Sequence, residues 1–436
     1  SSASTPKHFF TLTKITQITE ILQKALASPQ LLDDVRTHVR NLETTFQGFR
    51  DYLNNQLAAV VASRRSHLNV SFEDLVRDLT LVGLGPNHVQ QLQTDVSNLN
   101  ESVLGITLQS PFRTKEDDEG NKYQLKEDIE LKLICLKPAV TFKCTTDAHS
   151  VIMASGTLSP LASSTLELGI PFATQLSVNH VVPQEHVFAA AIERHSAESN
   201  LLELNFTSWR DNRQKYHNQL GRIIEDICLV PHGILVFMPT KRRIEKLIAS
   251  WRESGHYNII RNLKQVFIEP NQRDQDDLHE IVQQYKIQAE TETGAILFAV
   301  MRGKLSEGIE FRDNHARALV TIGIPFAPTE DLSLTAKREY QHEIAGANEN
   351  ILDGWEWYCS NAFKALNQAI GRSIRHPQDW GAILLIDSRF SIDRNKYEKY
   401  LQNWVANSLA RDERGNSSRS MVDIVPELNA FVTSYV

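Results

Sequence analysis

Short apolar runs recur through the second half of this 436-residue chain, and the stretches between them are polar or of helical period. The runs lie at 233–237, 265–268, 294–300, 317–322 and 381–386. Runs of this length suit strands that are buried on both faces, and strands that alternate with helices predict a parallel sheet. The expected fold class is therefore α/β, a doubly wound parallel sheet.

The segments between these runs are expected to be helices, from Lys241 to Trp251 and at about 276–290, 330–346, 354–376 and 394–409. The polar stretches near 195–215 and 411–420 are expected to be loops.

The first 100 residues differ from the rest, because apolar residues at helical spacing predict helices from residue 12 onward. Along 35–60 these residues alternate by threes and fours, which is typical of a long helix packed on another helix. An intramolecular helical arm is favoured over a dimer zipper, because Phe46 and Phe49 suit a globular bundle better. Strands are expected at 131–136 and 139–142.

Composition limits the partners that the chain can have. The net charge is −7, so binding to nucleic acid must come from a local basic groove. The four cysteines have neither C-x-x-C spacing nor a zinc-ligand pattern, which favours buried thiols in a reduced, intracellular compartment. No apolar run approaches the ~20 residues that span a bilayer. The start at Ser1 is interpreted as a cut point or a loose tail.

The segment from Ala365 to His376 carries the strongest chemical signal. Read as a helix, it has an apolar seam of Leu366, Ile370 and Ile374 and a polar seam of Gln368, Arg372 and Arg375. The guanidinium fork fits phosphate oxygens, so one interpretation is a sensor of a nucleotide γ-phosphate. The other interpretation is a basic face paired to carboxylates, and this segment alone leaves both open.

The loop after the run at 294–300 contains Gly303 and Gly308, which would let backbone amides approach a phosphate. It is not a Walker A loop, because Leu305 follows Lys304 and Phe298 stands where the first glycine should be. A plain surface loop is the alternative. Farther along, Asp387 and Arg389 are interpreted either as a structural pair or as functional residues.

Six motifs in order together resemble the carboxyl-terminal half of an XPD-type (Rad3-like) superfamily 2 DNA helicase. They are Ser155-Gly-Thr-Leu-Ser-Pro160, Val236-Phe-Met-Pro-Thr240, Arg302-Gly-Lys-Leu-Ser-Glu-Gly-Ile-Glu-Phe311, Gly323-Ile-Pro-Phe326, Gln368-Ala-Ile-Gly-Arg-Ser-Ile-Arg-His376 and Asp387-Ser-Arg-Phe390. The resemblance covers about 131–410. It implies a helical part of the arch domain at 1–130, the last strand or strands of the first RecA-like domain at 131–170, and the second RecA-like domain at 171–436.

The resemblance also implies a role for each matching residue. The residues that act on ATP phosphates would be Gln368, Arg372 and Arg375, and those near the nucleotide would be Gly303, Glu307, Gly308, Glu310 and Gly371. Contacts to DNA, or coupling to it, would come from Ser155, Gly156, Thr157, Phe237, Pro239, Thr240, Lys304, Ser306 and Arg389. Two residues depart from the family pattern: Thr240 replaces a serine, and Glu310 replaces an aspartate.

The family implies an ATP-dependent 5′-to-3′ DNA helicase of DNA repair and genome maintenance, acting in the nucleus. Its cofactors would be ATP and Mg²⁺, held jointly with the first RecA-like domain, and its partners single-stranded or forked DNA and other DNA-repair proteins, with no membrane. This sequence has no Walker A loop, no Asp-Glu-Ala-His box and no four-cysteine pattern, so the 4Fe–4S cluster is expected only in a part that precedes it. The alternative is a non-hydrolysing fragment that binds DNA or protein. A nuclease relative of the DinG type is disfavoured because no acidic metal cluster is evident.

Overall fold

The structure is a computed structural model. It describes residues 181–436 apart from 271–274, 304, 306–308, 329–330, 347–350, 393, 413–414 and 416–417. Before residue 181 it describes 9–11, parts of 16–52, 67–70, 104–109, 112–116, 122–126, 130–136, 138–142, 145, 148–154, 165 and 167–176. The chain divides into two compact units. One comprises 1–151, 165–172 and 328–355, and the other 152–164, 173–327 and 356–436.

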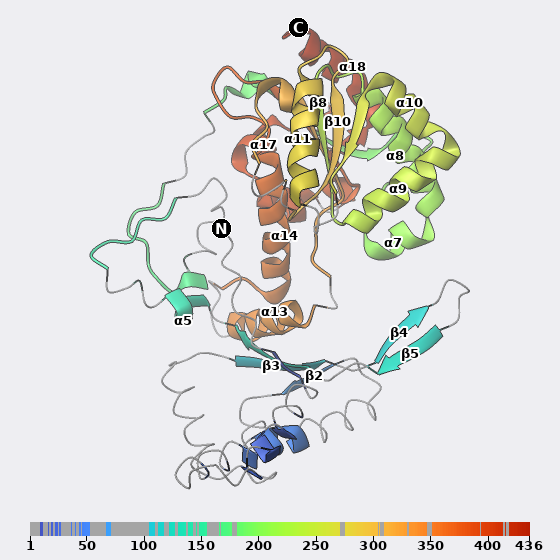
Figure 1. The fold of residues 1–436 in the computed structure, drawn as a ribbon. Helices are drawn as coiled ribbons and strands as arrows, with labels where there is room; N and C mark the ends of the chain where they lie inside the picture. The colour runs from blue at the N-terminus through green and yellow to red at the C-terminus, as the bar shows by residue number, and fades with distance from the viewer. Residues whose placement is uncertain are drawn as a thin grey trace. The chain divides into compact units, whose positions relative to one another are not determined.

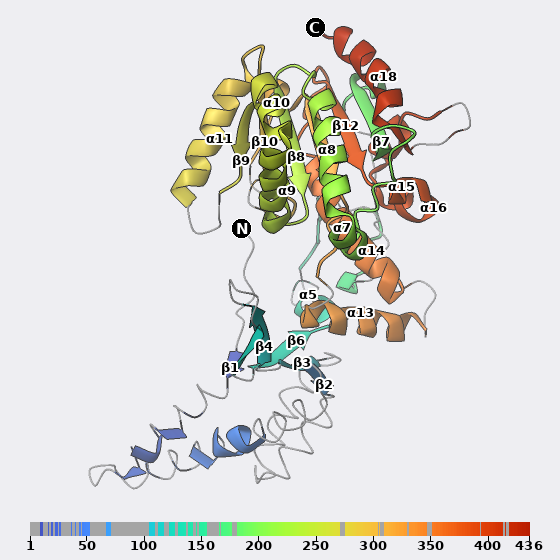
Figure 2. The ribbon, with the colours of Figure 1, turned by 90° about the vertical axis from the view of Figure 1, so that its right-hand side faces the viewer.

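A seven-stranded sheet forms the centre of the second unit, and all of its pairings are parallel (Figures 1 and 2). From one edge to the other its strands are β13 (Ser418–Ser420), β7 (Val187–Arg194), β12 (Gly381–Ile386), β11 (Ala318–Ile322), β8 (Gly233–Met238), β10 (Ala295–Val300) and β9 (Gln265–Ile268). The predicted α/β fold with a parallel sheet is confirmed.

Helices cover both faces of this sheet (Figure 2). Side chains from one face pack with α8 (Arg213–Ile227), α9 (Lys241–Ser254), α10 (His256–Leu263) and α18 (Met421–Thr433). Side chains from the other face pack with α11 (Gln275–Ala289), α14 (Gly354–Ile370) and α17 (Asn403–Ser408). Successive strand residues point to opposite faces, so Phe237 joins one cluster and Val236 the other. Burial on both faces explains the continuous apolar runs.

Short helices connect these elements. They are η2 (Gln184–His186), α7 (Phe206–Asp211), η3 (Asp313–Ala316), α15 (Arg389–Ile392), α16 (Arg394–Tyr397) and η4 (Glu398–Tyr400). Within the described residues, no helix is both long and apolar enough to cross a membrane.

The first unit contains an antiparallel sheet in the order β1 (Phe9–Thr11), β6 (Glu130–Cys135), β3 (Leu104–Gln109), β2 (His67–Val70). Strands β4 (Phe112–Glu116) and β5 (Lys122–Lys126) form a separate antiparallel pair. Helix α13 (Leu332–Ala345) places Ala336 and Tyr340 against Leu136, and Lys337 Nζ donates to the Leu136 carbonyl.

Two predictions for this first unit need correction. The region from residue 12 to 100 is not helical throughout, because β2 lies within it. Residues 139–142 are not a strand but belong to helix α5 (Pro138–Phe142). Proline favours the first turn of a helix, where its missing N–H would have no partner. The strand expected at 131–136 is confirmed as β6. Most of the predicted 35–60 helix lies outside the described residues, and the arch assignment of 1–130 stays a prediction.

Four predictions in the second unit also need correction. The loop expected near 411–420 contains strand β13, which pairs with β7. The helix expected to reach residue 376 ends at Ile370. The helix expected over 394–409 is broken, because Leu401 and Gln402 are extended and the buried Asn367 side chain bonds the Tyr400 carbonyl and the Gln402 N–H. The loop expected near 195–215 contains α7, which begins because the Asn205 side chain accepts from Ser208 N–H at 2.8 Å.

The packing of α14 predicts the result of two substitutions that lie two residues apart on the helix. Leu366 is fully buried in the core cluster, so Leu366→Ala is expected to lower the free energy of unfolding by about 2–5 kcal/mol. Gln368 on the same helix is exposed, and Gln368→Ala is expected to change it by less than about 0.5 kcal/mol. Denaturant unfolding of the two variants checks this, and equal losses would contradict the packing.

Candidate functional site

Three strand ends meet at the carboxyl edge of the parallel sheet. A Cβ placed on Gly323, just after β11, would lie 3.6 Å from Pro239 Cγ and 3.9 Å from Asp387 Oδ2. Pro239 and Thr240 follow β8, and the Thr240 hydroxyl accepts from Arg243 N–H at 3.3 Å as the N-cap of α9. The strand-end residues predicted to contact DNA are thus held at one edge, and Thr240 also starts the helix behind them.

Asp387 and Arg389 form a buried, bidentate pair after β12. Asp387 is fully buried, and its two oxygens accept from Arg389 Nε at 2.8 Å and Nη2 at 2.6 Å. Burial alone would lower the pKa of Arg389, but the Asp387 carboxylate outweighs it and the pKa is raised. The structural-pair interpretation is confirmed, while a DNA contact by Arg389 stays a prediction.

The backbone at Gly303 has room for no side chain. A Cβ there would lie 2.8 Å from the Val300 carbonyl oxygen and 3.0 Å from Glu269 Oε1. Glu269 is itself buried, and its Oε2 accepts from Val300 N–H at 2.6 Å. Arg302 beside it has a φ of 64°, and its Nη2 donates to Asn361 Oδ1 on α14 at 2.8 Å. These partners could not be predicted from local spacing, because Glu269 and Asn361 lie far from the loop in the chain.

Among the other residues of the predicted site, one lies in the core and seven lie outside the described residues. Phe237 is fully buried in β8, so its side chain serves the core rather than the surface. Seven predicted residues lie outside the described part of the chain: Ser155, Gly156, Thr157, Lys304, Ser306, Glu307 and Gly308.

The two predicted phosphate-binding arginines lie in the turn between α14 and β12, at the amino edge of the sheet. Bonds from Arg372 N–H to Ala369 and from Ser373 N–H to Ile370 tighten the last turn of the helix, and the Ser373 hydroxyl also bonds Ile370. The polar seam is therefore not a helix face. The predicted apolar seam is confirmed as a set of core residues, because Leu366, Ile370 and Ile374 are all buried.

The backbone of Arg375 is held by a hydrogen bond, whereas its side-chain Nε makes none among the described residues. Its N–H donates to Asp379 Oδ2 at 3.1 Å, and its side chain is half-buried. The buried Nε of Arg375 has no hydrogen-bond partner among the described residues. Gln368 is exposed one turn before Arg372, and the Gly371 N–H bonds the Asn367 carbonyl.

Glu310 lies within the field of both arginines. A hydrogen bond from Arg312 at 2.6 Å lowers the pKa of the Glu310 carboxyl, and the charges of Arg375 and Arg372 lower it further. The fold has thus brought Glu310, Arg372 and Arg375 together from two loops that precede neighbouring strands. The longer Glu310 side chain reaches Arg312, where the family pattern has aspartate.

Asp379 anchors the turn that carries the arginines. It is almost completely buried, and its Oδ1 accepts from Arg317 Nη1 at 2.8 Å and from Trp380 N–H at 3.0 Å. Arg317 also donates to the Trp380 carbonyl at 2.9 Å and stacks 4.6 Å from the Trp380 ring centroid. Burial lowers the pKa of Arg317, and Asp379 opposes this shift. Neither residue was among the predicted site residues.

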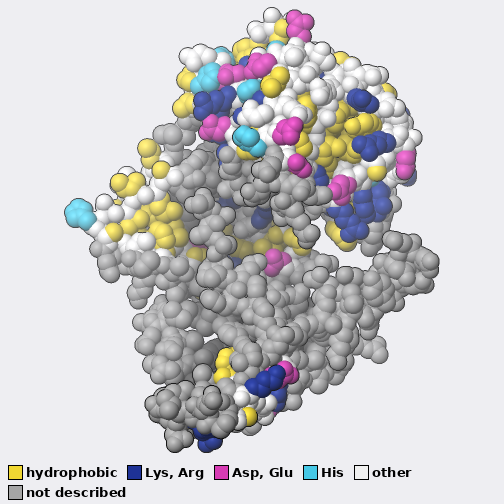
Figure 3. Space-filling model, in the orientation of Figure 1, with side chains coloured by type: hydrophobic (Ala, Val, Ile, Leu, Met, Phe, Trp, Pro, Cys, Tyr) yellow, Lys and Arg dark blue, Asp and Glu magenta, His cyan; other side chains and the backbone are white. Residues whose placement is uncertain are grey.

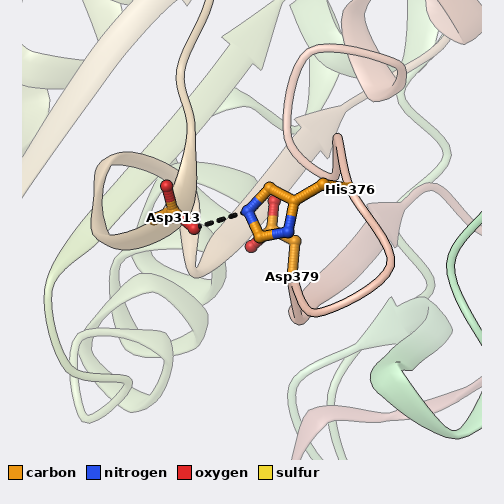
Figure 4. Close-up of side chains that lie close together, drawn as sticks. All are labelled: Asp313, His376 and Asp379. Atoms are coloured by element: carbon orange, nitrogen blue, oxygen red, sulfur yellow. Dashed lines mark hydrogen bonds and ion pairs between the residues drawn. The ribbon is translucent and has the colours of Figure 1, made fainter.

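A second ion pair closes the same turn (Figure 4). His376 Nε2 lies 2.8 Å from Asp313 Oδ1, and the hydrogen bond to Asp313 raises the pKa of His376. Ligand-type atoms of Asp313, His376 and Asp379 all lie within 4.8 Å of one another. The contacts to Arg317, Arg375 and His376 account for this grouping.

The predicted residues therefore fall into two sets at opposite edges of one sheet. The set at the carboxyl edge contains Pro239, Thr240, Gly303 and Arg389, and the set at the amino edge contains Glu310, Arg372 and Arg375. Residues 301–311 connect the carboxyl end of β10 to the segment that leads into β11, so one loop joins the two sets.

Comparison with known proteins identifies the larger part of the second unit. Residues 223–408 match the family described as "Helicase C-terminal domain", and this segment is such a domain. The chain is 35% identical over 345 residues to the Fanconi anemia group J protein homolog of Gallus gallus, covering 78% of this chain and 27% of the relative. It is 36% identical over 288 residues to the Regulator of telomere elongation helicase 1 homolog of Aedes aegypti, covering 65% of this chain and 27% of the relative.

The chain spans about a quarter of the length of these relatives, at 27% in both cases. Among solved structures, it is similar to S. cerevisiae Dbp5 bound to RNA and ADP BeF3, with 11% identity and a TM-score of 0.34. That match covers 64% of this chain and 53% of the other, and the likeness is too slight to carry an inference. These two relatives agree with the family resemblance to XPD-type helicases that the six motifs indicate.

The His376–Asp313 contact predicts a pH dependence of stability. A pKa raised by folding means that the contact stabilises fully below the unfolded value of about 6.5 and is lost as pH rises through the folded value. The melting temperature of His376→Gln should therefore lie farthest below that of the unchanged chain at pH 6, with the difference shrinking by pH 9. Thermal unfolding between these limits measures this, and a difference that grows with pH would refute it.

The buried pair predicts a larger effect for Asp379→Asn. Arg317 would keep its charge in the core without a carboxylate, so the free energy of unfolding is expected to fall by about 3 kcal/mol. Asp277→Asn, at an exposed position on α11, is the matched control and should change it by less than about 0.5 kcal/mol. Urea titration of both variants is the measurement, and similar midpoints would show that the pair does not anchor the turn.

Proposed function

We propose that this chain, whose residues 223–408 are a helicase C-terminal domain, acts as the second RecA-like domain of an ATP-dependent DNA helicase. In this proposal Arg372 and Arg375 reach the phosphates of an ATP held by a first RecA-like domain. The observation that carries it is the state of Arg375: Asp379 fixes its backbone, while its buried Nε has no partner among the described residues. A guanidinium on a fixed backbone, with an unused Nε donor, suits an anion that arrives from outside.

ATP would supply the transferred phosphoryl group, and the contribution of this chain would be positive charge at a fixed place. Arginines aimed at the phosphate oxygens stabilise the charge that develops during transfer. The charges of both arginines act on Glu310, which would keep their charge partly balanced before a nucleotide arrives. Gln368 is exposed one turn away and would orient the attacking water or a phosphate oxygen. Mg²⁺ would be held by the first RecA-like domain.

DNA would lie at the opposite edge of the sheet, along Pro239, Thr240 and the loop after β10. Contacts to phosphates rather than to base edges imply little sequence preference and a strong dependence on salt. The 301–311 loop would couple the ATP state at the amino edge to the DNA contacts at the carboxyl edge, since it connects the two edges. Translocation from 5′ to 3′ and action on single-stranded or forked DNA follow from the family resemblance.

A nuclear role in genome maintenance, alongside DNA-repair proteins, is part of the same proposal and is supported by the names of the two relatives. The second candidate is a fragment that binds DNA or protein without hydrolysing ATP. It is favoured by the absence of a Walker A loop from this sequence. Both candidates agree that the 436-residue chain by itself has no DNA-stimulated ATPase activity.

The test joins this chain to a first RecA-like domain that carries a Walker A loop and measures DNA-stimulated ATP hydrolysis. Arg372→Ala and Arg375→Ala are each expected to lower kcat by on the order of 10³, because arginine fingers contribute this much or more. Arg261→Ala, an exposed arginine on α10, is the control and should leave kcat unchanged. Binding of a single-stranded oligonucleotide should be the same in all three variants.

If both arginine variants hydrolyse ATP normally, the arginine-finger role is wrong. If the joined protein binds DNA but never hydrolyses ATP, the non-hydrolysing candidate is favoured. Robust hydrolysis by the 436-residue chain alone would contradict both candidates.

A further inference from the structure

An aromatic side chain stands out in the solvent at the start of α7. Phe206 is 74% exposed, although it belongs to a residue type that is usually buried. The Asn205 cap fixes it as the first residue of the helix, and Trp209 one turn later is buried in the core. The helix is thus held by its cap and by Trp209, and Phe206 contributes nothing comparable to the core.

This aromatic lies at the carboxyl edge of the sheet. The Cβ of Leu204, two residues before it, lies 3.5 Å from a Cβ placed on Gly323, and Pro239 Cγ lies 3.6 Å from the same point. Helix α9 contacts this segment directly. Its Arg243 donates to the Leu204 carbonyl at 3.4 Å, and the guanidinium lies 4.8 Å from the Trp209 ring centroid. The starts of α7 and α9 therefore form one surface.

Three cations lie on the same surface. Arg242 and Lys246 are one turn apart on α9, and Arg213 begins α8. Slight burial together with the charges of Arg242 and Arg213 lowers the pKa of Lys246, as expected where cations crowd. In the part of the chain that the structure describes, none of the three has an ion-pair partner. Figure 3 shows dark-blue side chains gathered over the region that Figure 1 labels α7 and α9.

We propose that Phe206, Arg213, Arg242 and Lys246 bind one segment of single-stranded DNA, with an unpaired base stacked on Phe206 and its neighbouring phosphates on the three cations. An exposed ring on the same surface as three unpaired cations suits a single strand, because stacking needs an accessible base and the backbone needs positive charge. The proposal rests on the proposed function, and it extends the DNA path from Pro239 and Thr240 onto α7. It assigns a base contact where the motif residues offer only phosphate contacts.

The ring is tested with the full 436-residue chain and a fluorescent oligo-dT strand, followed by anisotropy. Phe206→Ala is expected to weaken binding by on the order of 10-fold. Phe206→Tyr is expected to bind as tightly as the unchanged chain, because a tyrosine ring also stacks on a base. On a strand that lacks bases, and on heparin, the unchanged chain and Phe206→Ala should bind equally well. Circular dichroism and the melting temperature should not change in either variant, since the side chain is exposed.

The cations are tested by the salt dependence of the same binding. Arg242→Gln and Lys246→Gln should each reduce the slope of log Kd against log salt by about 0.7, the value for one phosphate of a single strand. Phe206→Ala should leave the slope unchanged. Arg222→Gln is the matched control, because Arg222 is exposed on the opposite side of α8 from Arg213 and should alter neither slope nor affinity.

Two failures are distinguishable. If the unchanged chain binds oligo-dT but Phe206→Ala binds equally well, or loses heparin binding to the same degree, the stacking contact is wrong and the proposed function stands. If the unchanged chain binds no single-stranded DNA at all, both the contact and the DNA edge of the proposed function are wrong.

Discussion

The buried ion pair between Arg317 and Asp379 is the interaction on which the arrangement of the amino edge depends. Arg317 precedes β11, and Asp379 precedes β12, so their 2.8 Å contact ties two neighbouring central strands at their starts. Both charges lie in the core, where an unpaired charge is costly, and each therefore requires the other. The second oxygen of Asp379 accepts from the Arg375 N–H, so the same carboxylate also holds the backbone of a residue that we propose binds phosphate.

Placing two sets of residues at opposite edges of one sheet suits a domain that must link two ligands. Helix α14 runs between the edges, and Arg302 at the carboxyl edge bonds Asn361 within that helix. The same helix ends at Ile370, and backbone hydrogen bonds continue from it into the turn that carries the arginines. If the proposed function holds, α14 is the packed element through which a change at the carboxyl edge would reach the turn of Arg372 and Arg375.

Much of this arrangement could be predicted, and the misses have physical causes. Strands such as β9 and β12 are found where the apolar runs predict them, because a strand buried on both faces leaves a continuous apolar signature. Helix ends were harder to predict. Periodicity continued through Ile374, which is buried after the helix has ended, so the apolar pattern persisted while the backbone changed. Strand β7 and helix α18 were not singled out at all.

The sequence by itself determined the parallel sheet and the order of its motifs, because both depend on local spacing. It also singled out Gln368, Arg372 and Arg375 as candidates for phosphate binding, and this assignment stays a prediction. Only the tertiary structure decided what surrounds them: that Asp379 holds the backbone N–H of Arg375, and that the charges of Arg372 and Arg375 act on Glu310. It also decided that Phe206 is exposed at the start of α7. The physical reason is that these partners come from separate loops, which meet only when the strands between them pair, and no local pattern records that meeting.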